Sequence, residues 1–218
     1  MIKAVIFDLD GTLLDTIPDI AASLNRALAD CGLPTHSVQA MKGFVGGGIR
    51  EAIRRAAPAG SSQETLEAVY RLYRAGYRER CCEETDYYPG AKAMLARLAA
   101  AGLALGVLSN KSQDTARRII AHYFPDTPFR CVFGREDGRP LKPDPGALAP
   151  VLETLGLLPA ELAYVGDSGT DVQFARACGM TAAGVPWGYR GWEELAAGKP
   201  DLLPETMEAL AAGLIARI

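Results

Sequence analysis

Short, continuously hydrophobic runs recur along the chain and predict the strands of a buried sheet. The first run, Ala4–Phe7, contains branched and aromatic residues and no polar residue. This composition is typical of a strand that is covered on both faces, as strands are in parallel sheets. Similar runs recur at Leu103–Leu108, Cys131–Phe133, Ala163–Val165 and Thr181–Val185. We therefore expect these segments to pair in one parallel sheet.

Segments with helical spacing lie between most of these runs. Their ranges are Gly90–Ala101, Gln113–His122, Pro145–Leu155 and Asp171–Cys178. Gly156 and Gly179 stand at positions where glycine commonly ends a helix. The alternation of strand and helix predicts an α/β fold with a doubly wound, Rossmann-like parallel sheet. In such sheets, ligands bind at the carboxyl ends of the strands.

One long stretch of the chain contains no strand pattern. Between residues 15 and 88, helical spacing is found at Ile17–Asp30, Gly48–Ala57 and Ser62–Arg80. In the last of these, one face collects the apolar and aromatic residues Leu66, Val69, Tyr70, Tyr73 and Tyr77. We therefore predict a helical cap domain, residues 15–88, inserted into an α/β core of residues 1–14 and 89–218. Hinges are expected near Leu14–Thr16 and Tyr87–Pro89.

Composition and charge narrow the class of protein. With 49% hydrophobic and 22% charged residues, the 218-residue chain is typical of a folded globular protein. The net charge is -3 and no basic tract occurs, so we expect no nucleic-acid partner. No run approaches the ~18 apolar residues of a membrane span. The five cysteines form no CxxC pair, which indicates reduced thiols and a cytoplasmic location.

Two carboxylates follow the first predicted strand. Asp8 comes directly after the run, and Asp10 is two residues further on. Neighbouring carboxylates repel each other, and a divalent cation with a preference for oxygen, such as Mg²⁺, would relieve the repulsion. One carboxylate could then attack phosphorus while the other acts as acid and base. Alternatively, the segment is only a strand followed by a turn at Gly11.

Two further segments contain groups that could bind phosphate. Ser109 and Asn110 follow the strand run that ends at Leu108, and their hydroxyl and amide could hold phosphate oxygens. Lys142 lies in a loop stiffened by prolines, where its ammonium could neutralise phosphate. The alternatives are a helix N-cap at Ser109 and a solvent-exposed lysine. Asp144 before Pro145 also fits a helix start.

The last segment with candidate site residues is Gly166–Asp171. Asp167 follows a predicted strand and is flanked by small residues, which suits a metal ligand. Ser168 and Asp171 also have the spacing of a helix capping box, an alternative that does not explain Asp167. Each segment alone has a structural explanation, but four of them at predicted strand ends favour a shared site.

Together, these motifs resemble those of the haloacid dehalogenase-like hydrolase superfamily over nearly the whole chain. The matching residues are Asp8-x-Asp10-Gly11-Thr12, Ser109, Lys142-Pro143 and Gly166-Asp167-Ser168-x-x-Asp171. The stretch of residues 15–88 stands where that family has its helical cap.

The resemblance implies a Mg²⁺-dependent phosphatase that forms an aspartyl-phosphate. Asp8 would be the nucleophile and Asp10 the general acid and base. Mg²⁺ would bind the side chains of Asp8 and Asp167 and the backbone carbonyl of Asp10. Asp171 would orient a metal-bound water or the lysine. Substrate contacts are implied for Thr12, Ser109, Asn110 and Lys142.

Three softer segments are similar to phosphoglycolate phosphatases. They are Asp15–Ile20, Val45–Arg50 and Gly184–Arg190. This resemblance implies a small phosphorylated metabolite as substrate, 2-phosphoglycolate first, with Arg50 paired to a substrate carboxylate. Alternatively, the glycines before Arg50 form only a turn. We interpret Trp187 and Tyr189 as packing residues.

Other activities of the superfamily fit less well or stay open. A dehalogenase would not need Asp10, and a phosphonate hydrolase would use a cap lysine, for which only Lys42 is present. A sugar-phosphate mutase remains an alternative, as does a non-catalytic binding protein on the same scaffold. The chain is expected to be a monomer or a homodimer.

Overall fold

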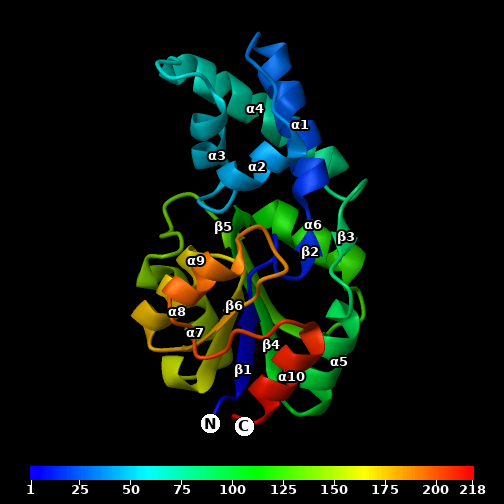
Figure 1. Ribbon diagram of the computed structural model, residues 1–218, viewed down its shortest axis with the longest axis vertical. Helices are drawn as coiled ribbons and strands as arrows, with labels where there is room; N and C mark the ends of the chain where they lie inside the picture. Colours follow the sequence, from blue (N-terminus) through cyan, green and yellow to red (C-terminus); the bar gives the residue numbers. More distant parts are fainter. The chain divides into compact units, whose positions relative to one another are not determined.

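The computed structural model describes all residues, Met1–Ile218, and divides into two compact units (Figure 1). The core unit comprises Met1–Leu14 and Tyr87–Ile218 and contains the main sheet. The helical unit comprises Asp15–Asp86. Tyr87 and Tyr88 thus belong to the core unit, whereas the sequence pattern predicted the core to resume at residue 89.

The five hydrophobic runs form one parallel sheet, which confirms the predicted fold class. Its strands stand in the order β5-β4-β1-β6-β7. Their bounds are β1 (Ala4–Phe7), β4 (Ala104–Ser112), β5 (Phe129–Arg135), β6 (Leu162–Gly166) and β7 (Thr181–Gly184). Strands β1 and β6 are buried along their whole length, as expected for strands covered on both faces.

The strand order creates a switch point between β1 and β6. From β1 the chain builds outward through β4 and β5, and it then returns to the other side of β1 to build β6 and β7. At such a point the connections leave in opposite directions, and a crevice forms outside the carboxyl ends of the strands. Asp8 and Asp167 each follow one of these two strands, so the topology brings both to the crevice.

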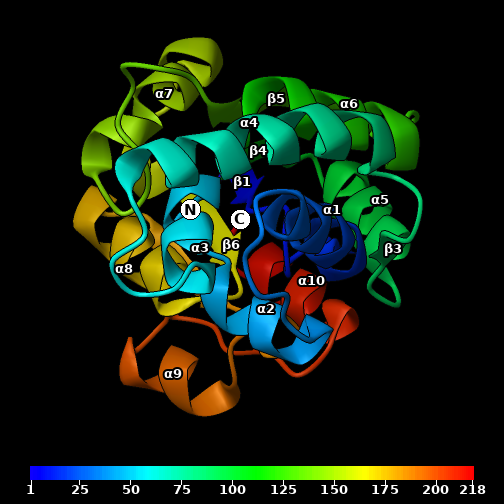
Figure 2. The ribbon, with the colours of Figure 1, turned by 90° about the horizontal axis from the view of Figure 1, so that it is seen from above.

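Helices cover both faces of the sheet (Figures 1 and 2). On one face lie α5 (Ala91–Ala100), α6 (Gln113–Tyr123) and α10 (Met207–Ile215). On the other face lie α7 (Ala149–Leu155) and α8 (Gly169–Cys178). A 3-10 helix, η1 (Pro145–Leu148), precedes α7, and another, η2 (Pro159–Glu161), precedes β6. The short helix α9 (Trp192–Ala197) contacts α8.

Several element bounds differ from the sequence pattern for identifiable reasons. Strand β4 continues to Ser112, past the expected end at Leu108, because its last residue pairs with Arg135 of β5. The predicted helix Pro145–Leu155 is divided into η1 and α7, and Pro150, which lacks an N–H, lies in the first turn of α7. Helices α9 and α10 were not predicted.

The helical unit contains four helices: α1 (Ile17–Asp30), α2 (Val38–Phe44), α3 (Ile49–Ala56) and α4 (Gln63–Arg80). Helix α2 was not predicted. Helices α1 and α4 pack together, and Tyr73 and Tyr77 of α4 are buried as the pattern predicted. Asp19 of α1 is buried and accepts hydrogen bonds from the N–H groups of Glu84 and Thr85, both at 2.9 Å. This carboxylate therefore ties α1 to the segment that follows α4.

Two chain crossings join the units. There, β2 (Leu14–Asp15) and β3 (Asp86–Tyr87) form a separate two-stranded sheet. None of the helices is both long enough and apolar enough to cross a membrane.

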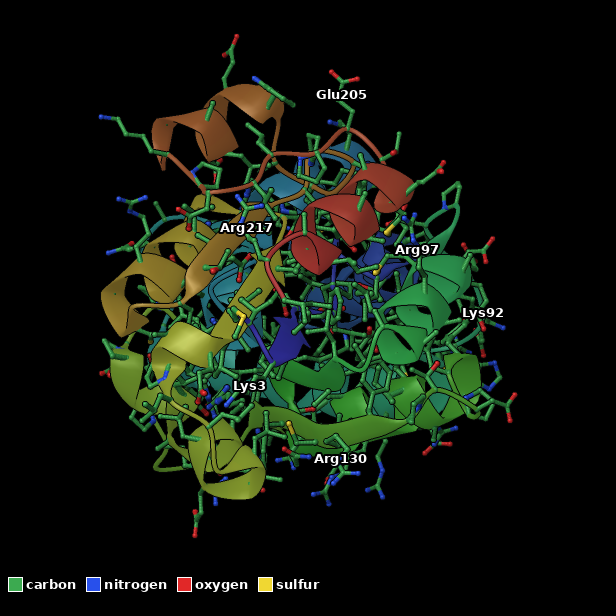
Figure 3. The ribbon with its side chains drawn as sticks, turned by 90° about the horizontal axis from the view of Figure 1, so that it is seen from below. Lys3, Lys92, Arg97, Arg130, Glu205 and Arg217 are labelled. Atoms are coloured by element: carbon green, nitrogen blue, oxygen red, sulfur yellow. The ribbon has the colours of Figure 1, made fainter.

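The amino ends of the main strands lie on the side of the core unit that is opposite the carboxyl ends of these strands. Both chain termini lie there, and the N–H of Ile2 donates to the carbonyl of Arg217 at 2.8 Å. Figure 3 views this side, and basic residues such as Lys3 and Arg130 lie around it. The cation of Lys3 is already paired with Glu161 at 2.6 Å. The predicted site residues of the core unit lie instead at or beyond the carboxyl ends of the strands.

Candidate active site

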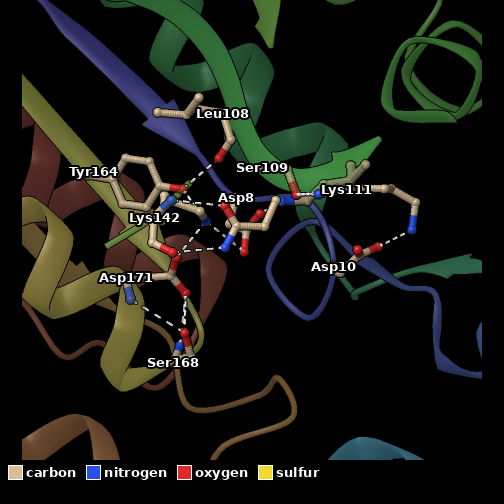
Figure 4. A network of polar contacts seen from close by, with 11 residues as sticks. Asp8, Asp10, Leu108, Ser109, Lys111, Lys142, Tyr164, Ser168 and Asp171 are labelled. Carbon is tan, nitrogen blue, oxygen red and sulfur yellow. Dashed lines mark hydrogen bonds and ion pairs between the residues drawn. The ribbon is translucent and has the colours of Figure 1, made fainter. Parts of the chain in front are cut away.

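The structure brings the predicted site residues of the core unit to one edge of the sheet (Figure 4). Asp8 follows β1, Ser109 lies near the end of β4, and Asp167 follows β6. Lys142 arrives from the loop before η1. Asp8, Ser109 and Asp167 are far apart in the sequence, and the parallel register of β1, β4 and β6 places them together.

Asp8 is held by contacts to both of its carboxylate oxygens. Its Oδ1 accepts from the N–H of Leu9 at 2.7 Å, and its Oδ2 lies 3.0 Å from the Nζ of Lys142. Burial raises the pKa of Asp8 to about 6, although the charge of Lys142 and a hydrogen bond from Ser109 oppose the rise. Ionisation of the Asp8 carboxylate near neutral pH therefore depends on this lysine.

Lys142 is a buried cation that contacts three polar side chains. Its side chain is 2% exposed, so the alternative of a solvent-exposed lysine is wrong. Besides Asp8, its Nζ donates to Asp171 Oδ1 at 2.7 Å and to the Tyr164 hydroxyl at 2.6 Å. Burial lowers the pKa of Lys142, but the charges of Asp171 and Asp8 outweigh it and hold the pKa well above its usual value. The ammonium thus stays charged.

The side chain of Asn110 fixes the backbone of Lys142. Its amide donates to the carbonyl of Lys142 and its oxygen accepts from the N–H of Lys142, both at 3.0 Å. Asn110 therefore attaches the lysine loop to β4. Ser109 is not a helix N-cap, because α6 starts only at Gln113 with Ser112 at the cap position. The predicted substrate contacts of Ser109 and Asn110 stay predictions.

Asp171 forms the capping box that its spacing suggested and also contacts the lysine, as the resemblance implied. Its Oδ2 accepts from the hydroxyl of Ser168 at 2.6 Å and from the N–H of Ser168 at 3.1 Å, which completes the capping box of α8. Its Oδ1 accepts from Lys142. Gly166 allows this approach, because a Cβ at that position would overlap the Asp171 side chain. Helix α8 thereby orients the carboxylate that holds the lysine.

Three carboxylates converge at the edge and could hold a cation. Oxygen atoms of Asp8, Asp167 and Asp171 lie within 4.8 Å of one another. Burial and then the charge of Asp171 raise the pKa of Asp167 well above its usual value, although the N–H of Tyr189 donates to its Oδ2 at 2.7 Å. A divalent cation with oxygen ligands would relieve this repulsion, so the donor set fits Mg²⁺.

Asp10 is held by a lysine to which the sequence analysis assigned no function. The Nζ of Lys111 lies 2.7 Å from Asp10 Oδ1, and the two side chains are 5% and 15% exposed. In Figure 4 this pair lies beside the cluster of Asp8, Lys142 and Asp171. In the sequence, a function for Lys111 was indicated only by its position directly after Ser109 and Asn110. Its partner lies 101 residues away in the sequence, so the pairing itself could not be inferred.

The loop after β7 contacts two segments of the site. The indole N–H of Trp187 donates to the carbonyl of Thr12 at 3.1 Å, and the backbone of Tyr189 holds Asp167. Trp187 and Tyr189 thus do more than the packing function we expected. The hydroxyl of Thr12 is buried and has no hydrogen-bond partner. The predicted substrate contact of Thr12 stays a prediction.

We predict that Gly188→Ala weakens the site. A Cβ at this position would overlap the carbonyl of Gly11 and the side chain of Asp167, so the loop or the carboxylate must move. Gly191→Ala is the matched control, because a Cβ there meets no atom within 4 Å. Titration of activity with Mg²⁺ should show a half-saturating concentration raised about ten-fold in Gly188→Ala and little changed in Gly191→Ala. Equal titration curves would show that the loop does not position Asp167.

Arg50 belongs to the helical unit, and its charge is paired there. Its guanidinium forms a two-bonded ion pair with Glu67 and lies over the ring of Tyr70, 3.8 Å from the centroid. These contacts tie α3 to α4. The glycines before it form the expected turn, with Gly48 at the start of α3. The predicted contact of Arg50 with a substrate carboxylate stays a prediction.

Known proteins are similar to this chain in sequence. A model of the family described as haloacid dehalogenase-like hydrolase matches residues 5–185. A phosphoglycolate phosphatase of Pseudomonas putida is 32% identical over 216 residues, which are 97% of this chain and 79% of that protein. A phosphoglycolate phosphatase of Chromobacterium violaceum is 38% identical over 192 residues, 86% of each chain.

A solved structure agrees over almost the whole chain. The crystal structure of a candidate phosphoglycolate phosphatase from Lactobacillus delbrueckii subsp. bulgaricus superposes with a TM-score of 0.91 at 28% identity. The match covers 97% of this chain and 98% of the other.

Proposed function

Because the chain belongs to the haloacid dehalogenase-like hydrolase family and is similar to its phosphoglycolate phosphatases, we propose that it hydrolyses a small phosphomonoester through an aspartyl-phosphate on Asp8. The observation that supports this most directly is the buried Lys142, whose ammonium contacts Asp8 and Asp171. Desolvating this ammonium is costly, and its ion pairs with two carboxylates offset part of the cost. Buried charge clusters of this kind are concentrated at functional sites.

In the proposed reaction, one oxygen of Asp8 attacks phosphorus and the bond to the leaving oxygen breaks. Lys142 keeps Asp8 ionised before the attack and lies 3.0 Å from its Oδ2, where its charge also offsets the charge of the phosphoryl oxygens. Ser109, which hydrogen-bonds to Asp8, would donate to the same phosphoryl group. Lys142 and Ser109 would thus stabilise negative charge on the phosphoryl oxygens during the transfer.

Asp10 is proposed as the acid and then the base. It would give a proton to the leaving oxygen of the substrate and later take one from the water that hydrolyses the aspartyl-phosphate. Lys111, 2.7 Å from Asp10 Oδ1, limits the motion of this carboxylate between the two steps.

Asp8 and Asp167, with the backbone carbonyl of Asp10, would hold Mg²⁺. When bound, this ion would supply positive charge that orients and polarises the phosphoryl group. Asp171 is proposed to act through Lys142, because its Oδ1 is occupied by that ammonium. The N–H of Tyr189 orients Asp167 for the ion.

We propose 2-phosphoglycolate as the first substrate to test. The support is that the relatives from Pseudomonas putida and Chromobacterium violaceum are named phosphoglycolate phosphatases. The test is release of inorganic phosphate from a panel of phosphorylated metabolites, ranked by kcat/KM. 2-Phosphoglycolate should rank first; a sugar phosphate that ranks higher would exclude it, and an isomerised sugar phosphate without free phosphate would indicate a mutase.

We expect a chelator to abolish activity and Mg²⁺ to restore it. Binding of the ion should also raise the melting temperature without any turnover, because a ligand at 100 times its Kd stabilises the folded state by about 2.7 kcal/mol. Asp167→Asn should lose this shift, whereas Asp114→Asn, an exposed carboxylate of α6, should keep it. Full activity in excess EDTA would contradict the metal assignment.

A further inference from the structure

Tyr164 of β6 is a buried polar residue that the proposed reaction leaves unused. It is 1% exposed, and its ring packs edge-on against Phe174 with the centroids 5.1 Å apart. Its hydroxyl lies between two segments of the site (Figure 4). It donates to the carbonyl of Leu108 at 2.6 Å and accepts from the Nζ of Lys142 at 2.6 Å.

The two partners of this hydroxyl fix its direction. A backbone carbonyl can only accept a hydrogen bond, and a lysine ammonium can only donate one. The phenolic proton of Tyr164 must therefore point to Leu108, and a lone pair must point to Lys142. A side chain at this position has to donate and accept at once, which phenylalanine cannot do.

Two hydrogen bonds hold the ammonium of Lys142. Its Nζ donates to the Tyr164 hydroxyl and to Asp171 Oδ1. These two acceptors are held by β6 and by the capping box of α8. Together they set the position of the Nζ, which lies 3.0 Å from Asp8 Oδ2.

We propose that Tyr164 is a positioning residue for phosphoryl transfer, which holds the ammonium of Lys142 beside Asp8 and fixes the residue of β4 that precedes Ser109. This inference rests on the proposed phosphatase function. Leu108, whose carbonyl accepts from Tyr164, directly precedes Ser109, so one hydroxyl links both groups that face the nucleophile. Without it, Lys142 keeps its two carboxylates but loses one of the two hydrogen bonds that hold its Nζ.

Tyr164→Phe should therefore affect the transition state more than the bound substrate. The position of the ammonium matters most when charge moves onto the phosphoryl oxygens. We expect kcat for p-nitrophenyl phosphate to fall about ten-fold to a hundred-fold, the effect of one lost hydrogen bond to a charged group. KM should change by less than about two-fold, because the lysine charge itself remains.

Inhibition by vanadate and by inorganic phosphate separates this effect from a merely structural one. Vanadate adopts the five-coordinate geometry of the transition state, whereas phosphate resembles the product. In Tyr164→Phe, the vanadate inhibition constant should rise about ten-fold and the phosphate constant should change little. Loss of folded protein lowers kcat in proportion but leaves both constants unchanged, so the ratio is informative even for a destabilised variant.

Tyr87→Phe is the matched control, since it also removes a tyrosine hydroxyl that donates to a backbone carbonyl, that of Tyr123. Its ratio of the two constants should equal that of the wild-type protein. A wild-type ratio in Tyr164→Phe would overturn the positioning function of Tyr164 while leaving the phosphatase function intact. A wild-type protein that neither hydrolyses p-nitrophenyl phosphate nor binds vanadate would contradict the proposed function, and this inference with it.

Discussion

Asp8→Asn is expected to lower the hydrolysis of p-nitrophenyl phosphate by at least about 10⁴-fold, because an amide cannot form the aspartyl-phosphate. The substitution preserves the shape of the side chain and its acceptor for the N–H of Leu9. The measurement is a steady-state rate with excess Mg²⁺. Asp30→Asn, which changes an exposed carboxylate at the end of α1, should keep the wild-type rate. Turnover within ten-fold of wild type in Asp8→Asn would exclude Asp8 as the nucleophile.

The same variant should be at least as stable as the wild-type protein when both are free of metal. Burial raises the pKa of Asp8 from 3.8 to about 6 in the folded state. A carboxyl group with a raised pKa stabilises the fold below its unfolded pKa, and that contribution is lost as the pH rises through its folded pKa. Metal-free wild-type protein should therefore lose stability between about pH 4 and pH 6, by roughly 3 kcal/mol at about 1.4 kcal/mol per pH unit.

Urea unfolding of the metal-free proteins at several pH values tests this point. The difference in unfolding free energy between Asp8→Asn and wild type should grow in favour of the variant from pH 4 to pH 7. This separates the loss of the nucleophile from a loss of the fold. A variant that is less stable than wild type at pH 7 would show that the ion pair of Asp8 with Lys142 outweighs the cost of burial.

Lys142→Met is expected to damage both activity and stability. Methionine fills a similar volume, but it leaves the carboxylates of Asp8 and Asp171 buried beside each other without their cation. Removing one partner from a buried ionic cluster typically costs about 3–5 kcal/mol. Loss of the charge that faces the phosphoryl group should lower kcat by about 10²–10⁴-fold. Urea unfolding and the steady-state rate measure the two effects separately.

The double variant Lys142→Met with Asp171→Asn distinguishes the two effects. Neutralising Asp171 removes one of the uncompensated charges, so part of the lost stability should return, whereas the activity should not. Lys3→Met is the matched control, because Lys3 forms an ion pair with Glu161 at the surface, where its side chain is 59% exposed. Such surface pairs contribute at most about 1 kcal/mol. A Lys142→Met enzyme with wild-type kcat would refute the function assigned to the lysine.

The elements that matched the sequence pattern best are those whose signals are local. Strand β1 spans Ala4–Phe7 and α1 spans Ile17–Asp30, as the hydrophobic spacing predicted. Helix α10 was missed although it is apolar, because the prediction followed the alternation of strand and helix and ended with the last strand run. It packs against α5, which lies far away in the sequence. Strand β4 was predicted too short because its polar end is recruited by β5.

The residues of the candidate site also fall into two groups: those that a local sequence signal indicates and those that only the tertiary structure reveals. Asp8 and Asp167 could be found because each follows a fully hydrophobic run, and strand ends in such sheets face the ligand crevice. Tyr164 could not be found, since a tyrosine inside a hydrophobic run gives the same pattern whether or not its hydroxyl has a function. The pairing of Lys111 with Asp10 also lacked a signal, because no local spacing relates two residues 101 positions apart.

Hydrophobic spacing and short motifs were thus enough to predict the fold class, three of the four inserted helices and the four segments of the site. These properties depend on neighbours within a few residues, whose geometry the backbone period sets directly. Which side chains hold one another depended on strand order and register, which bring segments of distant sequence to one edge. The burial of Lys142 between Asp8, Asp171 and Tyr164 therefore follows from tertiary packing alone.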